Sequence, residues 1–158
     1  MTAIPRPLVA AALGVSPDAL PPGDLPVARL AERWLGWLAA TERAEAPDAL
    51  PDYWTDVLLA RLALEAPDLC LSAVLAVLAR CETPEQVAHL AAGPLEDLLH
   101  RNGAAVIGRI EAEAQANLRL RLALSGVAPD GSPGAPLWQR VQAARGGEPG
   151  LDDGARLP

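Results

Sequence analysis

The sequence predicts an all-α fold: an irregular bundle, or a short α-solenoid-like stack, of about seven helices that ends in a Gly/Pro-rich C-terminal tail. Three observations support this prediction. Prolines stand where helices begin, apolar residues recur between them at three- and four-residue steps, and 51% of the residues are hydrophobic. A chain of 158 residues with this composition can bury a sizeable core.

The first two expected helices carry most of the tryptophans. A helix from about 25 to 44 has Asp24 as its N-cap and Pro26 in its first turn. Its apolar stripe consists of Leu30, Trp34, Trp37, Leu38 and Thr41. A second helix, over 51–65, places Trp54 on its apolar stripe. Because the chain has no phenylalanine, we expect these indole rings to supply most of the aromatic core packing.

Proline, glycine and capping residues mark where the next helices begin and end. A helix over 67–80 is apolar on nearly every side, which is typical of the centre of a bundle. Thr83 and Gln86 then form a capping box, Gly93 ends that short helix in the left-handed conformation, and Pro94 opens the next. The expected antiparallel helix pairs are 51–65 with 67–80, 83–92 with 94–101, and 104–116 with 117–125.

The segment "NLRLRLALSG" alternates apolar and charged residues, which is a strand pattern. No partner strand follows it, and leucine, arginine and alanine all favour helices, so we expect a helix over 117–125. The predicted organisation is an irregular N-terminal arm (1–24) that can include a turn of helix near Leu8 to Leu13, a helical domain (25–127), a loop with a docking helix (128–145) and a disordered tail (146–158).

Charge and composition exclude several function classes. The net charge of −7 disfavours nucleic-acid binding, which needs a clustered basic surface. The absence of lysine excludes a Schiff-base lysine and a phosphate-binding loop of the P-loop type. The most apolar segment, 69–79, is too short to span a bilayer, so we expect no membrane association.

The two cysteines indicate a reducing compartment. Cys70 and Cys81 lie eleven residues apart on one predicted helical segment, a separation of roughly 16 Å that is too long for a disulfide. Two buried free thiols are typical of a cytoplasmic protein. The bias towards alanine, arginine, proline and glycine suggests a GC-rich bacterial genome, so we expect a cytoplasmic bacterial protein without a cofactor.

The stretch "GPLEDLLHRNG" supplies the candidate binding residues Glu96, Asp97 and His100. On a helix its leucines face inward and these three side chains face outward. The i,i+4 spacing of Glu96 and His100 also stabilises a helix face that is merely solvated, and this interpretation stays open. Trp138 is the fourth candidate, on a short amphipathic helix that either docks on the domain or recognises a partner.

A metal site is an alternative interpretation of the same region. His89, Glu96 and His100 are suitable ligands, and they could meet if their two helices pack face to face. The helical periodicity places His89 on the polar side of its helix, beside Glu85, which argues against that arrangement. We therefore predict no metal ligands.

The segment from His89 to Val127 resembles a family of small bacterial proteins known as a domain of unknown function. The likeness is strongest over 86–127, and its most specific part is the Leu-Ala-Ala-Gly-Pro-Leu-Glu-Asp-Leu-Leu core at 90–99. Relatives carry a tryptophan directly after Ser-Gly-Val, where this chain has Ala128. The resemblance implies an all-α domain but no reaction or ligand. The residues taken as a structural signature are Gly93, Pro94, Leu95, Trp34 and Trp54.

The leading functional hypothesis is a non-catalytic protein–protein interaction module that binds another protein. Immunity proteins and toxin inhibitors offer an analogy in size, acidity and simplicity. Two alternatives remain. One is a metal-dependent protein or enzyme that uses His89, Glu96 and His100, and the other is a homo-oligomeric structural protein.

Overall fold

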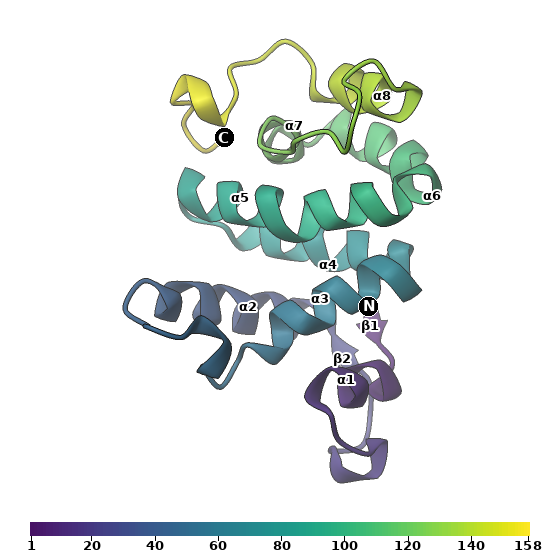
Figure 1. Cartoon of the computed structure of the whole chain (residues 1–158), viewed down its shortest axis with the longest axis vertical. Coiled ribbons are helices and arrows are strands. Elements are labelled where there is room, and N and C mark those ends of the chain that lie inside the picture. The colour runs from purple at the N-terminus through teal and green to yellow at the C-terminus, as the bar shows by residue number, and fades with distance from the viewer. The chain divides into compact units, whose positions relative to one another are not determined.

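The structure is a computed structural model that describes residues 1–158. It confirms the predicted all-α fold: eight α-helices are accompanied by one pair of two-residue strands (Figure 1). The chain divides into two compact units, Met1–Arg80 (unit 1) and Cys81–Pro158 (unit 2). None of the helices combines the length and the apolar composition that a membrane-spanning helix requires.

Unit 1 is built from four helices and the small sheet. Its elements are β1 (Ala3–Ile4), α1 (Arg6–Leu13), a 3₁₀ turn (Pro17–Ala19), β2 (Leu25–Pro26), α2 (Val27–Thr41), a second 3₁₀ turn (Pro47–Ala49), α3 (Trp54–Glu65) and α4 (Pro67–Arg80). The strands pair antiparallel, with Ala3 opposite Pro26 and Ile4 opposite Leu25. Helix α4 packs against both α2 and α3, and α1 packs against α3.

The N-terminal segment is more regular than the predicted arm, because α1 extends the helical turn expected near 8–13 back to Arg6. Helix α1 is ended by Gly14, which adopts the left-handed conformation at φ 68°. Ile4 is fully buried, and Val9 and Ala10 face the interior. The segment is ordered because these apolar side chains anchor it, although its prolines obscure the helical period.

The start of α2 also differs from the prediction. Pro26 occupies the N-cap position and no side chain caps the helix. The Asp24 carboxylate instead accepts a hydrogen bond from the backbone N–H of Arg6, at 3.1 Å. Because Asp24 precedes β2, its side chain reaches across to the start of α1 and not forward into α2.

Trp34 lies at the centre of unit 1. Its side chain is 2% exposed, and its indole Nε1 donates to Asp56 Oδ1 at 3.1 Å. Trp37 is half-buried beside it, with ring centroids 6.2 Å apart, and also contacts Tyr53. The polar end of the Trp34 indole is thereby satisfied inside a core of leucine, valine and alanine.

Unit 2 contains α5 (Pro84–Leu90), a π-helical turn (Ala91–Leu95), α6 (Glu96–Ala114), α7 (Leu118–Leu124), α8 (Pro136–Arg145) and a 3₁₀ turn (Leu151–Asp153). The predicted capping box is confirmed: Thr83 Oγ1 accepts from Gln86 N at 3.2 Å, and Gln86 Oε1 accepts from Thr83 N at 3.3 Å. Helix α8 packs against α6 and α7, and its Val141 is fully buried.

The predicted break at Gly93 and Pro94 is absent. Gly93 is not among the glycines with positive φ, and the chain passes from α5 to α6 through the π-helical turn without a hairpin (Figure 1). In an α-helix the Pro94 ring would clash with the carbonyl group of Leu90, and Pro94 has no N–H to donate to it. The wider π-helical turn accommodates the proline, so one continuous rod replaces the expected pair of helices.

A smaller irregularity stands where the second of these helices was expected to end. Asn102 has φ −142° and ψ 32° inside α6, so the helix is kinked where the sequence predicts that one helix ends and the next begins. Gly103 follows the kink, and a Cβ there would lie 2.6 Å from Leu137 Cδ2 of α8. Glycine therefore lets α8 approach α6 closely.

The segment "NLRLRLALSG" forms the expected helix, α7. Asn117 caps it, because its side-chain oxygen accepts from Leu120 N at 3.0 Å. The tail after α8 differs from the predicted disorder. Gly150 is buried, and Leu151 N donates to Ser125 Oγ at 2.9 Å. Asp153 accepts from Gly150 N at 2.7 Å, which closes the last turn.

Both cysteines are free and buried, as the sequence predicts. Burial raises the pKa of the Cys81 thiol to about 11, and the positive charge of Arg119 offsets part of that effect. The thiol is therefore protonated at neutral pH, which makes it a poor nucleophile.

Candidate functional site

Glu96 and His100 hold the backbone of Ala128 between them. Glu96 Oε2 accepts a hydrogen bond from Ala128 N at 2.8 Å, and His100 Nε2 lies 2.8 Å from Ala128 O. A carbonyl oxygen only accepts, so His100 Nε2 must carry the proton in this contact. We call this arrangement the Ala128 clasp.

The clasp explains the i,i+4 spacing that the sequence shows. Glu96 begins α6 directly after the π-helical turn, and His100 lies one turn further on the same face. The chain leaving α7 crosses this face. A Cβ on Gly126 would lie 3.0 Å from Ala91 Cβ, so that glycine lets the chain approach the π-helical turn. Sequence periodicity places both side chains on the outer face of the helix; the structure leaves His100 exposed and Glu96 half-buried there, and both also hydrogen-bond the backbone of Ala128.

Removing the Glu96 carboxylate should loosen the backbone at Ala128. In Glu96→Ala we expect the Ala128 amide proton to exchange with solvent about fivefold faster, which corresponds to about 1 kcal/mol for one hydrogen bond. Glu85→Ala, at an exposed position of α5, is the matched control and should leave that rate unchanged. Amide hydrogen exchange measured by NMR checks this, and an unchanged Ala128 rate in Glu96→Ala would contradict the clasp.

The other predicted residues lie apart from the clasp contacts. Asp97 is half-buried in the first turn of α6, and Trp138 is half-buried on α8. Helix α8 is fixed to α6 by a bidentate pair in which Arg140 Nε and Nη2 each donate to Glu111 at 2.7 Å. Hydrogen bonding to Arg140 also lowers the pKa of the Glu111 carboxyl.

The alternative metal site is not assembled. His89 is exposed on α5 and lines a shallow hollow with Glu85, Ala88, Ala92 and Gly93. Glu96 and His100 are engaged with Ala128 instead. No group of three or more histidine, cysteine, aspartate or glutamate side chains is placed to hold a metal ion.

Unit 1 contains a concave surface that the sequence did not reveal, with a volume of about 400 Å³. We call it the arginine-rimmed groove. Its apolar lining comprises Val9, Leu13, Leu20, Pro21, Pro22, Leu25, Pro26 and Trp54. Its polar residues are Arg6, Asp24, Arg29 and Arg33. Leu13 is 37% exposed, so part of its apolar surface is accessible in the groove.

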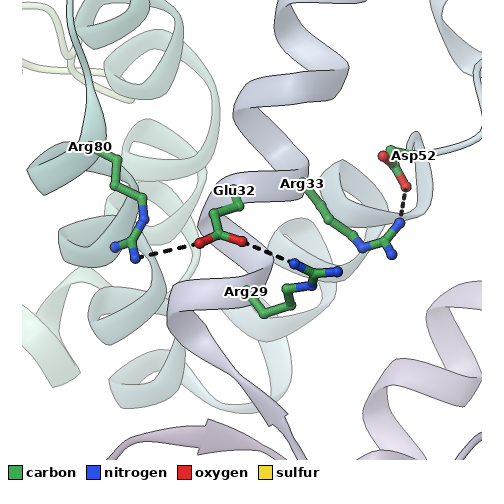
Figure 2. A network of polar contacts seen from close by, with 5 residues as sticks. All are labelled: Arg29, Glu32, Arg33, Asp52 and Arg80. Atoms are coloured by element: carbon green, nitrogen blue, oxygen red, sulfur yellow. Dashed lines mark hydrogen bonds and ion pairs between the residues drawn. The ribbon is translucent and has the colours of Figure 1, made fainter.

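Ion pairs position two of the arginines on the rim (Figure 2). Arg29 Nη1 lies 3.2 Å from Glu32, whose other oxygen lies 3.8 Å from Arg80 Nη2. Arg33 Nη1 lies 3.1 Å from Asp52 Oδ1. Arg29 and Arg33 stand one turn apart on α2, and their side chains remain 58% and 44% exposed. Each guanidinium therefore keeps donors available to a ligand.

The arrangement suits a ligand that is apolar in the middle and negatively charged at one edge. The apolar lining offers burial for hydrophobic side chains. Arg29 and Arg33 offer planar donor sets that match carboxylates. Two sequence signals point to this groove in retrospect: the Pro21-Pro22-Gly23 turn, and the i,i+4 arginines on the polar side of the Trp34 helix.

Comparison with protein-family models identifies one match, to a family described as "Family of unknown function (DUF6869)", over residues 42–148. Comparison with curated proteins and with solved structures gives no significant match. The matched range includes the Ala128 clasp and α3 to α8, whereas most of the arginine-rimmed groove precedes it. The match covers more than half of the chain and agrees with the likeness in the Gly-Pro-Leu-Glu-Asp core, so the chain belongs to this family of unknown function.

Proposed function

We propose that this protein is a non-catalytic interaction module that holds a short acidic and apolar segment of another protein in the arginine-rimmed groove. The observation that carries the proposal is the juxtaposition of an exposed apolar lining with Arg29 and Arg33 on its rim. Tryptophan, tyrosine and arginine side chains supply much of the binding energy in protein interfaces, and this groove offers Trp54 and two rim arginines.

Leu13 and Trp54 supply the apolar contacts. Trp54 is half-buried at the start of α3, so part of its indole surface faces the groove. A leucine or tryptophan side chain of the partner would bury this surface, and each buried aliphatic side chain contributes about 1.5–3 kcal/mol. The groove has room for a few side chains, which suits a peptide segment.

The rim selects the charge of the partner. The chain as a whole carries −7, so its average field repels acidic peptides and attracts basic ones. Each of the three groove arginines lies within 4.0 Å of a carboxylate, so selection of an acidic segment depends on the guanidinium donors that those pairs leave unused. Preference for an acidic segment would therefore report on the groove, because nonspecific attraction predicts the opposite preference.

The enzymatic alternative has less support. The Glu96 carboxylate and the His100 Nε2–H both form hydrogen bonds with the backbone of Ala128, which indicates a structural role. A general acid or base must reach a substrate proton with a free lone pair or donor. The clasp occupies Glu96 Oε2 and His100 Nε2, so a proton transfer in this state would have to use the other carboxylate oxygen or ring nitrogen.

The experiment is selection from a phage-displayed library of random peptides on the full chain. We expect enrichment of peptides that combine aspartate or glutamate with leucine, isoleucine or tryptophan. A selected peptide should lose about tenfold in affinity towards Leu13→Glu and towards Arg29→Glu, as measured by fluorescence anisotropy.

Two exposed positions of unit 1 outside the groove provide matched controls. Leu64→Glu, at a side chain that is 54% exposed on α3, and Arg43→Glu should both leave peptide affinity unchanged. Enrichment of basic peptides would contradict the proposal. So would acidic peptides that bind the groove variants and the control variants equally well. If the groove binds a peptide taken from this chain's own sequence, the partner is a second copy of the chain and not another protein.

A further inference from the structure

A second cavity lies in unit 2, with a volume of about 270 Å³. We call it the C-terminal cavity. Its polar residues are Arg121, Arg145, Arg156 and Glu148, and its remaining lining is Leu118, Leu122, Pro149, Ala155 and Pro158. The side chains of this lining carry three guanidinium groups and one carboxylate, although the chain as a whole is acidic.

The three arginines differ in how their donors are used. All three side-chain nitrogens of Arg121 donate within the protein: Nε to Ala114 O at 2.6 Å, Nη2 to Gln115 O at 3.2 Å, and Nη1 to Glu148 Oε1 at 2.7 Å. It thereby ties the last carbonyl groups of α6 to the segment after α8. Arg121 has a structural role in this state.

Arg145 is different. Its Nε is buried and has no hydrogen-bond partner in the protein. Leaving a buried, charged donor without an acceptor costs free energy, so a ligand oxygen that reached this guanidinium would offset that cost. Gly150 makes room for this guanidinium, because a Cβ there would lie 2.7 Å from Arg145 Nη2. Arg156, on the same cavity wall, is exposed.

We propose that the C-terminal cavity binds a small organic carboxylate with a short apolar chain. The carboxylate oxygens would accept from Arg145 and Arg156, since a planar carboxylate matches a guanidinium. Leu118 and Leu122 would cover the apolar chain. Leu118 is 53% exposed, so its surface is available to such a ligand. The volume fits a molecule with a handful of carbon atoms.

Glu148 sets the affinity of this site. It accepts from Arg121 on the cavity wall, and its own backbone together with Arg121 lowers the pKa of its carboxyl. At neutral pH it is therefore ionised and repels an incoming anion. Its side chain is 48% exposed and is held by Arg121 at 2.7 Å. Neutralising Glu148 should strengthen binding, whereas neutralising Arg145 should weaken it.

The test is isothermal titration calorimetry of the full chain with 4-methylpentanoate as the probe, with 4-methylpentanamide and inorganic phosphate as parallel titrants. We expect the carboxylate to bind and the neutral amide, which has the same shape, to bind at least about tenfold more weakly. Phosphate should bind more weakly than the carboxylate, because it gains nothing from the leucines. Phosphate that binds equally well or better would overturn the assignment to an organic acid.

Variants of the cavity residues should change the affinity for 4-methylpentanoate in opposite directions. Arg145→Gln and Arg156→Gln should each weaken 4-methylpentanoate binding about tenfold, and Glu148→Gln should tighten it about threefold. Arg101→Gln, at an exposed position outside the cavity, is the matched control and should change nothing. Thermal unfolding without the probe verifies that each variant is folded. Absence of carboxylate binding to the native chain, or equal affinities in Arg145→Gln, Arg156→Gln and the control, would overturn the proposal. The cavity and the groove use different residues, so either result stands independently of the proposed function.

Discussion

Replacing Trp34 by alanine should lower the free energy of unfolding of unit 1 by about 3–5 kcal/mol, the range for removal of a large buried aromatic side chain. Trp34 is 2% exposed, and its loss would open a cavity beside α4, which packs on α2. The variant would also lose the hydrogen bond from the indole to Asp56 Oδ1. Two costs therefore add at one site.

Urea unfolding followed by far-ultraviolet circular dichroism measures this loss, because circular dichroism does not depend on the removed fluorophore. Trp37→Ala is the control on the same helix. Its ring is half-buried and its Nε1 donates to the exposed carbonyl oxygen of Pro47, so a smaller loss is expected. Equal losses in the two variants would show that Trp34 is not the centre of the unit 1 core.

The second large effect is expected at Gly126. Gly126→Val should destabilise unit 2 by about 1–3 kcal/mol through overpacking. A Cβ at this position would lie 2.7 Å from Leu151 Cδ1 and 3.0 Å from Ala91 Cβ. The leucine side chain can rotate away, but the Ala91 methyl is fixed to the backbone of the π-helical turn. The new side chain would therefore push the segment after α7 away from the start of α6.

Gly108→Val is the matched control, because a Cβ on that exposed position of α6 would meet no atom within 4 Å. Its stability should stay within about 0.5 kcal/mol of the parent. Thermal and urea denaturation of both variants measure the difference. Ala128 amide exchange should accelerate in Gly126→Val alone, because displacement of this segment also opens the clasp. Equal stability of the two variants would contradict the close packing at Ala91.

The elements that follow from local chemistry were predictable. Thr83 and Gln86 form a capping box wherever they start a helix, and the proline at 67 marks the start of α4. Residues 117–125 alternate as in a strand, but no partner strand follows them, so the sequence predicts the helix that the structure contains. These signals depend on neighbours within one or two turns, so the sequence contains them directly.

The elements that depend on tertiary packing were not predictable. By local signals alone, Gly93 ends one helix and Pro94 begins another. The π-helical turn forms instead because a continuous helix buries Leu90, Ala91 and Leu95 together. The tail "GGEPGLDDGARLP" has a disordered composition, yet Gly150 and Leu151 find places against Ser125. No periodicity encodes those contacts.

The same distinction applies to the candidate site. The spacing of Glu96 and His100 identified two side chains that share a face, but the sequence could not place Ala128 between them. The arginine-rimmed groove joins α1, the segment before β2, α2 and the start of α3. Its prediction required α1 to be a helix, and the prolines of that segment argued for an irregular arm.

The central claim is that Arg29 on the groove rim contacts a carboxylate of the partner segment. A charge-swap measurement tests it most directly. The affinity of a selected acidic peptide is measured for the native chain and for Arg29→Glu. Variants of this peptide, each with one glutamate replaced by arginine, are then measured against the same two proteins. The proposed contact predicts that Arg29→Glu loses about tenfold in affinity and that one of the arginine peptides restores binding to this variant while binding the native chain weakly. If no arginine peptide restores binding, or if each one binds both proteins equally, the groove is not where the partner is held.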